Sequence, residues 1–438
     1  MIKRIAFIAV LSGTGQLLSI FVLKYISQRL PVHTMNSLAQ LDALFQLLLN
    51  LIALGLQSSA MRNITLSREW KVEYLQTQSA RLTLALLLSM IGLFSFIDWE
   101  YCLFFIAPIL ALNGDYALYA LGKPVKGAFI GFIRIVVPYS LLLITTYLKP
   151  EAANAVFLGS WVIIYLITNI LINSYLKVDI KVRPEWKHLQ LYLKSLPLGA
   201  VSLSFYFLGL GLLLIVPYFY PPVTGTIAFM GLKFYVIFKG VLRIIHQAFL
   251  KEMTSTIWCL KVDELSMLIG MVLLGSVLIY PESFITLFFG KQFIPERSFF
   301  TYLGIAALLY SFVLSTTTRA LLEKKDLPYT VITLIAAVMA LACTIVISFW
   351  SPRADSIAIS ICVGELALVA GLIYIAADSG LLKPRLRFLL FNSVLFAIPL
   401  GFRCILADNL LWYITSFGLL ALALAFLHRN TFKLFTEQ

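Results

Sequence analysis

The chain consists of long apolar runs separated by short polar segments. Fourteen runs are close to or above the roughly 20 residues that a helix needs to cross a bilayer. Because each run is continuous and does not alternate apolar and polar residues over about ten positions, the pattern predicts transmembrane helices and not the strands of a membrane barrel. The predicted spans are approximately 4–28, 36–60, 75–97, 101–119, 127–148, 152–176, 195–217, 222–248, 264–281, 298–321, 328–350, 356–377, 388–407 and 409–427.

Composition supports this assignment to an all-α polytopic membrane protein. Of 438 residues, 61% are hydrophobic and only 13% are charged, which excludes a soluble multidomain protein. The formal net charge is +13, and the positive residues of the loops fall mostly on one side of the predicted spans. Only Arg29, Lys149, Lys291, Arg297 and Arg353 fall on the other side.

The rule that positive loops stay inside therefore predicts that both termini are cytoplasmic. Lys251, Lys324 and Arg429 are among the cations on that side. Since the positive charge follows topology, nucleic acid is not an expected partner.

A weak internal repeat predicts two lobes. Pro31 and Pro221 follow the first and seventh runs, and "QSSAMRNIT" at 57–65 corresponds to "QAFLKEMT" at 247–254, a separation near 190 residues. A repeat of six spans returns the chain to its starting side, so the two copies have the same orientation. We expect six-helix lobes at 1–190 and 191–378, two additional helices in 379–438, and a cavity between the lobes that opens alternately to each side.

Ionisable residues within the runs include more cations than acids. The cations are Lys24, Arg134, Lys233, Lys239, Arg243, Arg319 and Arg403, and the acids are Asp42, Asp115 and Glu365. A cation at the centre of a span costs roughly 2.5 to 3.5 kcal/mol, and three acids can pair with at most three cations. The remainder are expected to face water, lipid phosphates or an anionic ligand.

The stretch "FMGLKFYVIFKGVLRIIHQAFL" (229–250), which covers most of the eighth run, carries three of these cations and no acid. At 100° per residue, Lys239, Arg243 and His246 lie within about 60° of one another and form a stripe, with Lys233 to one side. This stripe favours a basic cavity that receives an anion. Snorkelling toward headgroups is the alternative for Arg243, and also for Lys24 and Arg403 near the outer ends of their spans.

The three acids have several possible partners. Asp42 could pair with Lys24 across the first hairpin. Glu365 could pair with Arg319 or bind a coupling proton or cation. For Asp115 the same choice between ion pair and coupling site stays open.

Motifs for enzyme chemistry or cofactor binding are not found in the sequence. "ALGKPV" and "FFGKQF" lack the spacing and hydroxyl of a phosphate-binding loop. The four histidines form no metal or triad pattern, and the odd number of scattered cysteines predicts neither disulfides nor a metal cluster. We therefore expect a transporter that is not an enzyme and needs no cofactor or metal.

Three segments make the chain similar to the polysaccharide-unit flippases, often called the Wzx type, of the multidrug/oligosaccharidyl-lipid/polysaccharide exporter superfamily. They are "GLQSSAMRNI" (55–64), "NGDYALYALGKPVKGAFIGFIRIV" (113–136) and "ALLEKKDLPYTVITLI" (320–335). The resemblance covers essentially the whole chain. It implies a bacterial inner-membrane protein that moves an undecaprenyl-diphosphate-linked oligosaccharide, as in O-antigen or lipopolysaccharide biosynthesis, from the cytoplasmic to the periplasmic leaflet.

The resemblance also implies a cationic lumen for the diphosphate, which makes six residues candidates for binding it. These are Lys233, Lys239, Arg243, Arg134, Arg319 and Lys24. Expected partners are the lipid-linked substrate, membrane lipids, and the polymerase and chain-length regulator of the same pathway. Two alternatives are an ion-coupled multidrug or organic-ion exporter of the same superfamily, and a polysaccharide polymerase or ligase. An exporter of cations would favour an acidic cavity, and a polymerase would carry a large external loop.

Overall fold

A computed structural model of the chain describes residues 2–178, 182–248, 253, 255–322, 325–375, 380–405 and 408–427. Throughout this described part, the regular structure is helical, which confirms the all-α fold class. The helices up to the middle of the chain are α1 (Ile2–Ile26), α2 (Val32–Ala53), α3 (Leu56–Leu66), α4 (Trp70–Ser89), α5 (Ala107–Ala111), α6 (Asp115–Ala120), α7 (Pro124–Leu148), α8 (Ala153–Leu176), α9 (Gln190–Phe207) and α10 (Val216–Phe219).

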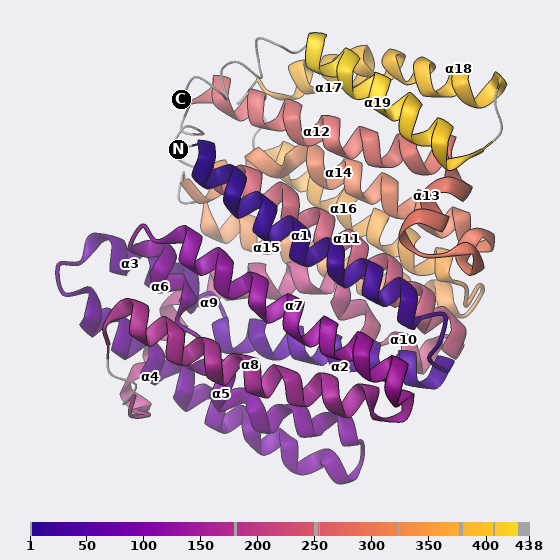
Figure 1. Cartoon of the computed structure of the whole chain (residues 1–438). Helices are drawn as coiled ribbons and strands as arrows, with labels where there is room; N and C mark the ends of the chain where they lie inside the picture. Colours follow the sequence, from indigo (N-terminus) through magenta and orange to yellow (C-terminus); the bar gives the residue numbers. More distant parts are fainter. Residues whose placement is uncertain are drawn as a thin grey trace. The chain divides into compact units, whose positions relative to one another are not determined.

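The second half of the chain is also built from helices (Figure 1). Its helices are α11 (Pro222–Ala248), α12 (Thr256–Ile279), α13 (Pro281–Phe288), α14 (Arg297–Leu322), α15 (Asp326–Ser348), α16 (Ala354–Ile375), α17 (Leu382–Ser393), α18 (Ala397–Ile405) and α19 (Leu410–Leu427). Short 3₁₀ helices, among them Met90–Phe96 and Trp99–Ile106, extend or connect several of them.

The predicted spans correspond closely to these elements. Within the described residues, ten helical stretches are long and apolar enough to cross a membrane, and the bent pair Val32–Ala53 and Leu56–Thr65 would make 11. Helices also cover the other predicted runs, at α1, α9 and the shorter apolar α19. The chain is therefore a multi-pass membrane protein.

The second predicted span is not the continuous helix that its hydropathy suggested. α2 ends at Ala53 and α3 begins at Leu56, with a bend of 47° between them. Gly55 occupies the left-handed region at φ +74°, and a Cβ there would overlap the backbone of Ser195 and Gly199 in α9. At the bend, glycine therefore allows the backbone to approach α9 closely.

The seventh predicted span is interrupted. α9 continues through Pro197 and Gly199 and ends at Phe207, and a 3₁₀ helix starts at Leu210, directly after Gly209.

Contacts divide the chain into two compact units. The N-terminal unit is Ala6–Pro217, and the C-terminal unit is Tyr218–Gln438 together with Met1–Ile5. α9 packs against α2, α3 and α4 of the N-terminal unit. The repeat-based lobes 1–190 and 191–378, and the extension 379–438, stay predictions. The cytoplasmic location of both termini also stays a prediction. Three of the loop cations on which it was based, Lys251, Lys324 and Arg429, lie outside the described residues.

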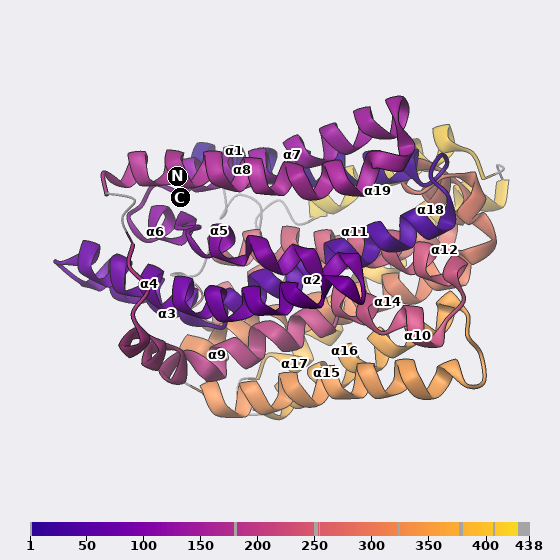
Figure 2. The ribbon, with the colours of Figure 1, turned by 90° about the horizontal axis from the view of Figure 1, so that it is seen from below.

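In the N-terminal unit, α7 and α8 lie side by side (Figures 1 and 2). The indole of Trp161 in α8 stacks on Phe45 of α2 at 3.9 Å between ring centroids. This contact attaches α8 to α2, while the packing of α8 on α7 brings Thr168 and Asn169 of α8 next to Arg134 of α7.

In the C-terminal unit, α14 is central because it packs against both α12 and α16, and α15 covers α16 (Figure 2). α18 and α19, drawn in yellow in Figure 1, pack against each other. The core of this unit is rich in phenylalanine: Phe234, Phe284 and Phe289 contact one another, and Phe300 contacts Phe289.

Candidate functional site

Arg134 is the centre of a buried polar network in the N-terminal unit. From α7 it donates to the Thr168 hydroxyl at 2.9 Å and to the side-chain amide oxygen of Asn169 at 3.3 Å, both on α8. Its Nη1 lies 3.3 Å from the Asp115 carboxylate, and its guanidinium lies 4.2 Å from the centroid of the Tyr165 ring. The planar, five-donor arginine fork suits such a set of partners.

Asp115 connects this network to α3. It begins α6, where the Asn113 side chain accepts a hydrogen bond from its backbone N–H at 3.2 Å. Gln57 of α3 lies at 3.5 Å from its other carboxylate oxygen. The sequence named no partner for Asp115, and the structure pairs it with Arg134.

Lys239 and Glu365 form the corresponding pair of the C-terminal unit. The Lys239 ammonium on α11 lies 2.8 Å from Glu365 Oε1 on α16, and the Tyr235 hydroxyl donates to the same oxygen at 2.6 Å. The ammonium also lies 4.9 Å and 4.6 Å from the ring centroids of Tyr235 and Tyr310. Glu365 is completely buried, and its second oxygen has no hydrogen-bond partner within the described residues.

The environment changes along the predicted cationic stripe. Lys239 and His246 are buried, and the His246 ring lies 3.1 Å from the Ser266 hydroxyl. Arg243, between them, is exposed and lies beside Tyr310. The stripe is therefore not one uniform basic surface, because Lys239 is neutralised by a carboxylate from another helix.

The other candidates occupy varied positions. Lys233 on α11 is buried, Arg319 on α14 is partly buried, and Lys24 in the last turn of α1 is partly exposed. Asp42 on α2 is buried. Whether any of the six cations binds substrate, and whether Asp42, Asp115 or Glu365 couples an ion, stays a prediction.

Several buried charges were not identified from the sequence. Arg81 lies within the third apolar run, was left out of the cation inventory, and donates to the Asn113 carbonyl. Asp263 and Arg385 looked like loop residues near span ends, yet Arg385 Nη2 lies 2.6 Å from the Asp263 carboxylate. A count of every charge inside the runs would have found Arg81, and extending it three or four residues beyond each predicted boundary would have found Asp263 and Arg385.

The Asp263–Arg385 pair joins three helices. Asp263 of α12 accepts from the Ser315 hydroxyl at 2.6 Å, and Arg385 of α17 donates to the Ser315 and Thr316 hydroxyls of α14 at 3.0 and 2.9 Å. The pair thus attaches the start of the C-terminal helices to the body of the unit. In the described part of the chain, no group of three or more histidine, cysteine or acidic side chains could hold a metal ion.

Comparison with known proteins shows the fold. No family model matches the chain, and no curated protein matches its sequence. Among solved structures, "Lipid II flippase MurJ, inward closed conformation" superposes with a TM-score of 0.72 at 12% identity, over 97% of this chain and 99% of that one.

Structures of multidrug transporters are also similar to this chain, but over a smaller share of its length. A MATE transporter in complex with MaL6 gives a TM-score of 0.54 at 14% identity, over 87% of this chain and 97% of that one. An outward-facing multidrug resistance MATE transporter of the MOP superfamily gives a TM-score of 0.54 at 15% identity, over 87% of this chain and 96% of that one. The chain therefore has the fold shared by these flippase and transporter structures.

Proposed function

We propose that the chain is a flippase that moves an undecaprenyl-diphosphate-linked oligosaccharide unit from the cytoplasmic to the periplasmic leaflet of a bacterial inner membrane. The observation that carries the proposal is the extent of the likeness to the lipid II flippase, 97% of this chain at a TM-score of 0.72, against 87% and 0.54 for the MATE structures. Movement would follow alternating access, with both termini in the cytoplasm.

Arg243 is the leading candidate for the diphosphate. It is exposed, whereas Arg134 and Lys239 are buried and already face carboxylates. A diphosphate would have to replace Asp115 or Glu365 to engage those two cations directly. Lys233, Arg319 and Lys24 are secondary candidates.

Glu365 is the leading candidate for coupling to an ion. One of its oxygens holds Lys239 and Tyr235, while the other has no hydrogen-bond partner in the described part of the chain. A buried carboxylate with spare acceptor capacity inside a membrane can take a proton or cation. Asp42 and Asp115 are less favoured. The pathway's polymerase and chain-length regulator would be partners; nucleic acid and cofactors would not.

A multidrug or organic-ion exporter of the same superfamily is the second candidate. The likeness to MATE structures supports it.

Transport by the full-length protein in vesicles decides between these functions. A fluorescent lipid-linked oligosaccharide should become accessible at the opposite leaflet, while a cationic dye should not be moved. Arg243→Ala should slow flipping, and Arg353→Ala, at another exposed arginine, should not. If the protein moves the dye but not the lipid-linked sugar, the flippase proposal is wrong and the exporter is the function that the result supports.

A further inference from the structure

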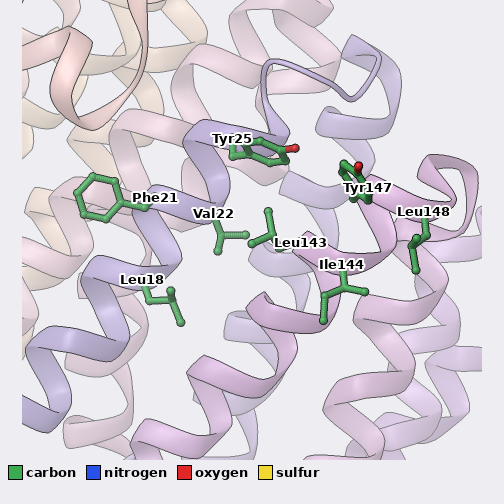
Figure 3. A pocket seen from close by; sticks show the side chains of 8 residues that line it. All are labelled: Leu18, Phe21, Val22, Tyr25, Leu143, Ile144, Tyr147 and Leu148. Carbon is green, nitrogen blue, oxygen red and sulfur yellow. The ribbon is translucent and has the colours of Figure 1, made fainter.

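A lipid-facing groove on the N-terminal unit lies between α1 and α7. It has a volume of about 480 Å³ and is lined entirely by apolar and aromatic side chains (Figure 3). These are Leu18, Phe21, Val22, Tyr25, Leu143, Ile144, Tyr147 and Leu148. The lining residues recur at helical spacing on one face of each helix, so the groove follows both helices toward their C-terminal ends.

The groove lies beyond a contact between the two helices. At Gly15 a Cβ would lie 3.4 Å from the Phe132 ring, so α1 and α7 approach closely there. Further along, Phe21 is 44% exposed, Ile144 53% and Tyr147 65%. The apolar surface between them is available to a ligand from the membrane.

Arg29 stands at one end of this groove. Its guanidinium lies 4.7 Å from the ring centroid of Tyr25 and 5.5 Å from that of Tyr147, both within the range of a cation–π contact. Figure 3 shows these two tyrosines together at the end of the groove away from Leu18. Arg29 is exposed.

An arginine held in this way is suited to a phosphate. Stacking uses the face of the guanidinium and leaves its in-plane N–H groups available for bidentate bonds to an oxyanion. Lys149, exposed and adjacent in sequence to Leu148, adds a positive charge at this end; Glu151, also exposed, is the nearest acid in sequence. An apolar channel with a cation at its end is the arrangement that an anionic lipid would recognise.

The length of the groove indicates which lipid. From Leu18 to Tyr25 the helix rises about 10 Å, which is about two thirds of the roughly 15 Å hydrocarbon depth of one leaflet. This length and the volume suit one acyl chain better than a long polyisoprenyl chain.

We propose that the α1/α7 groove is a binding site for an anionic glycerophospholipid, with one acyl chain along Leu18, Val22 and Ile144 and the headgroup phosphate on Arg29. Lys24 and Arg134, two of the candidate transport residues, belong to the same two helices but do not line the groove. The site does not depend on which substrate the protein moves. It would hold one lipid in the leaflet on the side of the α1–α2 turn.

Native mass spectrometry of the full-length protein, released from nanodiscs with equal phosphatidylglycerol and phosphatidylcholine, tests the site. The wild type should retain phosphatidylglycerol preferentially. Arg29→Gln should lower that preference about fivefold, since a basic side chain near an anionic membrane surface contributes about 1 kcal/mol and 1.4 kcal/mol corresponds to tenfold. Arg29→Lys should keep most of the preference, and Arg353→Gln should not change it.

Ile144→Trp separates the groove from simple surface charge. It fills the apolar channel and leaves Arg29 in place, so it should remove the same bound lipid. An unchanged preference in either Arg29→Gln or Ile144→Trp would overturn the site, as would an equal loss in Arg353→Gln. Displacement of phosphatidylglycerol by an equal amount of undecaprenyl phosphate would overturn the choice of an acyl chain.

Discussion

The ammonium of Lys239 lies 2.8 Å from the carboxylate of Glu365, although 126 positions separate the two residues in the chain. Both groups are buried, and Tyr235 and Tyr310 surround the ammonium. A residue that the sequence presented as an excess cation is therefore half of an internal ion pair. Because the two charges compensate each other, substituting one residue alone should leave the other charge buried without its counter-ion.

Removing the carboxylate of this pair should destabilise the protein strongly. Glu365→Gln leaves the Lys239 charge buried without its counter-ion, and breaking a buried pair in this way costs about 3 to 5 kcal/mol. Thermal unfolding in detergent measures the loss. Glu185→Gln breaks the exposed Lys187–Glu185 pair and should change stability by less than about 1 kcal/mol.

The double variant Lys239→Met/Glu365→Gln checks the cause. It removes both charges and should recover much of the lost stability. If it unfolds as readily as Glu365→Gln alone, the ion pair is not what holds α11 against α16.

Arg134 should tolerate lysine poorly even though lysine keeps the charge. A lysine can still reach one acceptor but cannot hold Thr168, Asn169 and Asp115 together as the guanidinium does. Each lost hydrogen bond is worth about 1 kcal/mol. A double-mutant cycle with Asp115→Asn should give a coupling of about 0.5 to 3 kcal/mol; strictly additive effects would show that the two side chains do not interact.

The contact between the α2–α3 bend and α9 should not accept a methyl group. A Cβ at Gly199 would lie 2.6 Å from the Leu54 carbonyl oxygen, so Gly199→Ala should force the backbones apart and lower the melting temperature. Gly159→Ala is the matched control, because a Cβ there meets nothing within 4 Å. It should be neutral or stabilise α8 by roughly 0.5 to 1 kcal/mol. Equal effects of the two substitutions would contradict the close approach.

Arg243→Ala should reduce surface-polysaccharide production at an unchanged protein level. Arg243→Lys should be milder if the substrate requires only a positive charge, and equally damaging if the guanidinium binds a phosphate through two bonds. Polymer yield, normalised to membrane protein, measures both. Wild-type yield from Arg243→Ala would remove this residue from the proposed diphosphate site.

Arg385→Gln should loosen α17 from α12. Asp263 would lose its buried counter-ion, and Cys259, which is buried in a cluster with Val262 and Leu381, would become accessible. Maleimide labelling of a variant that keeps only this cysteine should be slow with Arg385 present and clearly faster with glutamine. Unchanged protection would mean that apolar packing alone attaches α17.

The sequence by itself determined the class of protein and the placement of most helices. Crossing a bilayer requires an apolar stretch of a certain length, and this requirement is local. Each run from 4–28 to 409–427 therefore corresponds to a helical stretch in the structure. The interruption after Phe207 coincides with Gly209, whose conformational freedom is a property of its own backbone.

Tertiary structure decided the partners of the charges. Hydropathy places Lys239 and Glu365 in separate spans, but whether they meet depends on how α11 and α16 are rotated and offset. The same is true of Asp263 and Arg385, whose position near span boundaries made them look like loop residues. The bend at Gly55 also depends on a distant segment, since α9 lies about 140 residues further along the chain. Burial of an apolar run depends on composition, whereas an ion pair depends on the direction of two particular side chains, and packing alone fixes that direction.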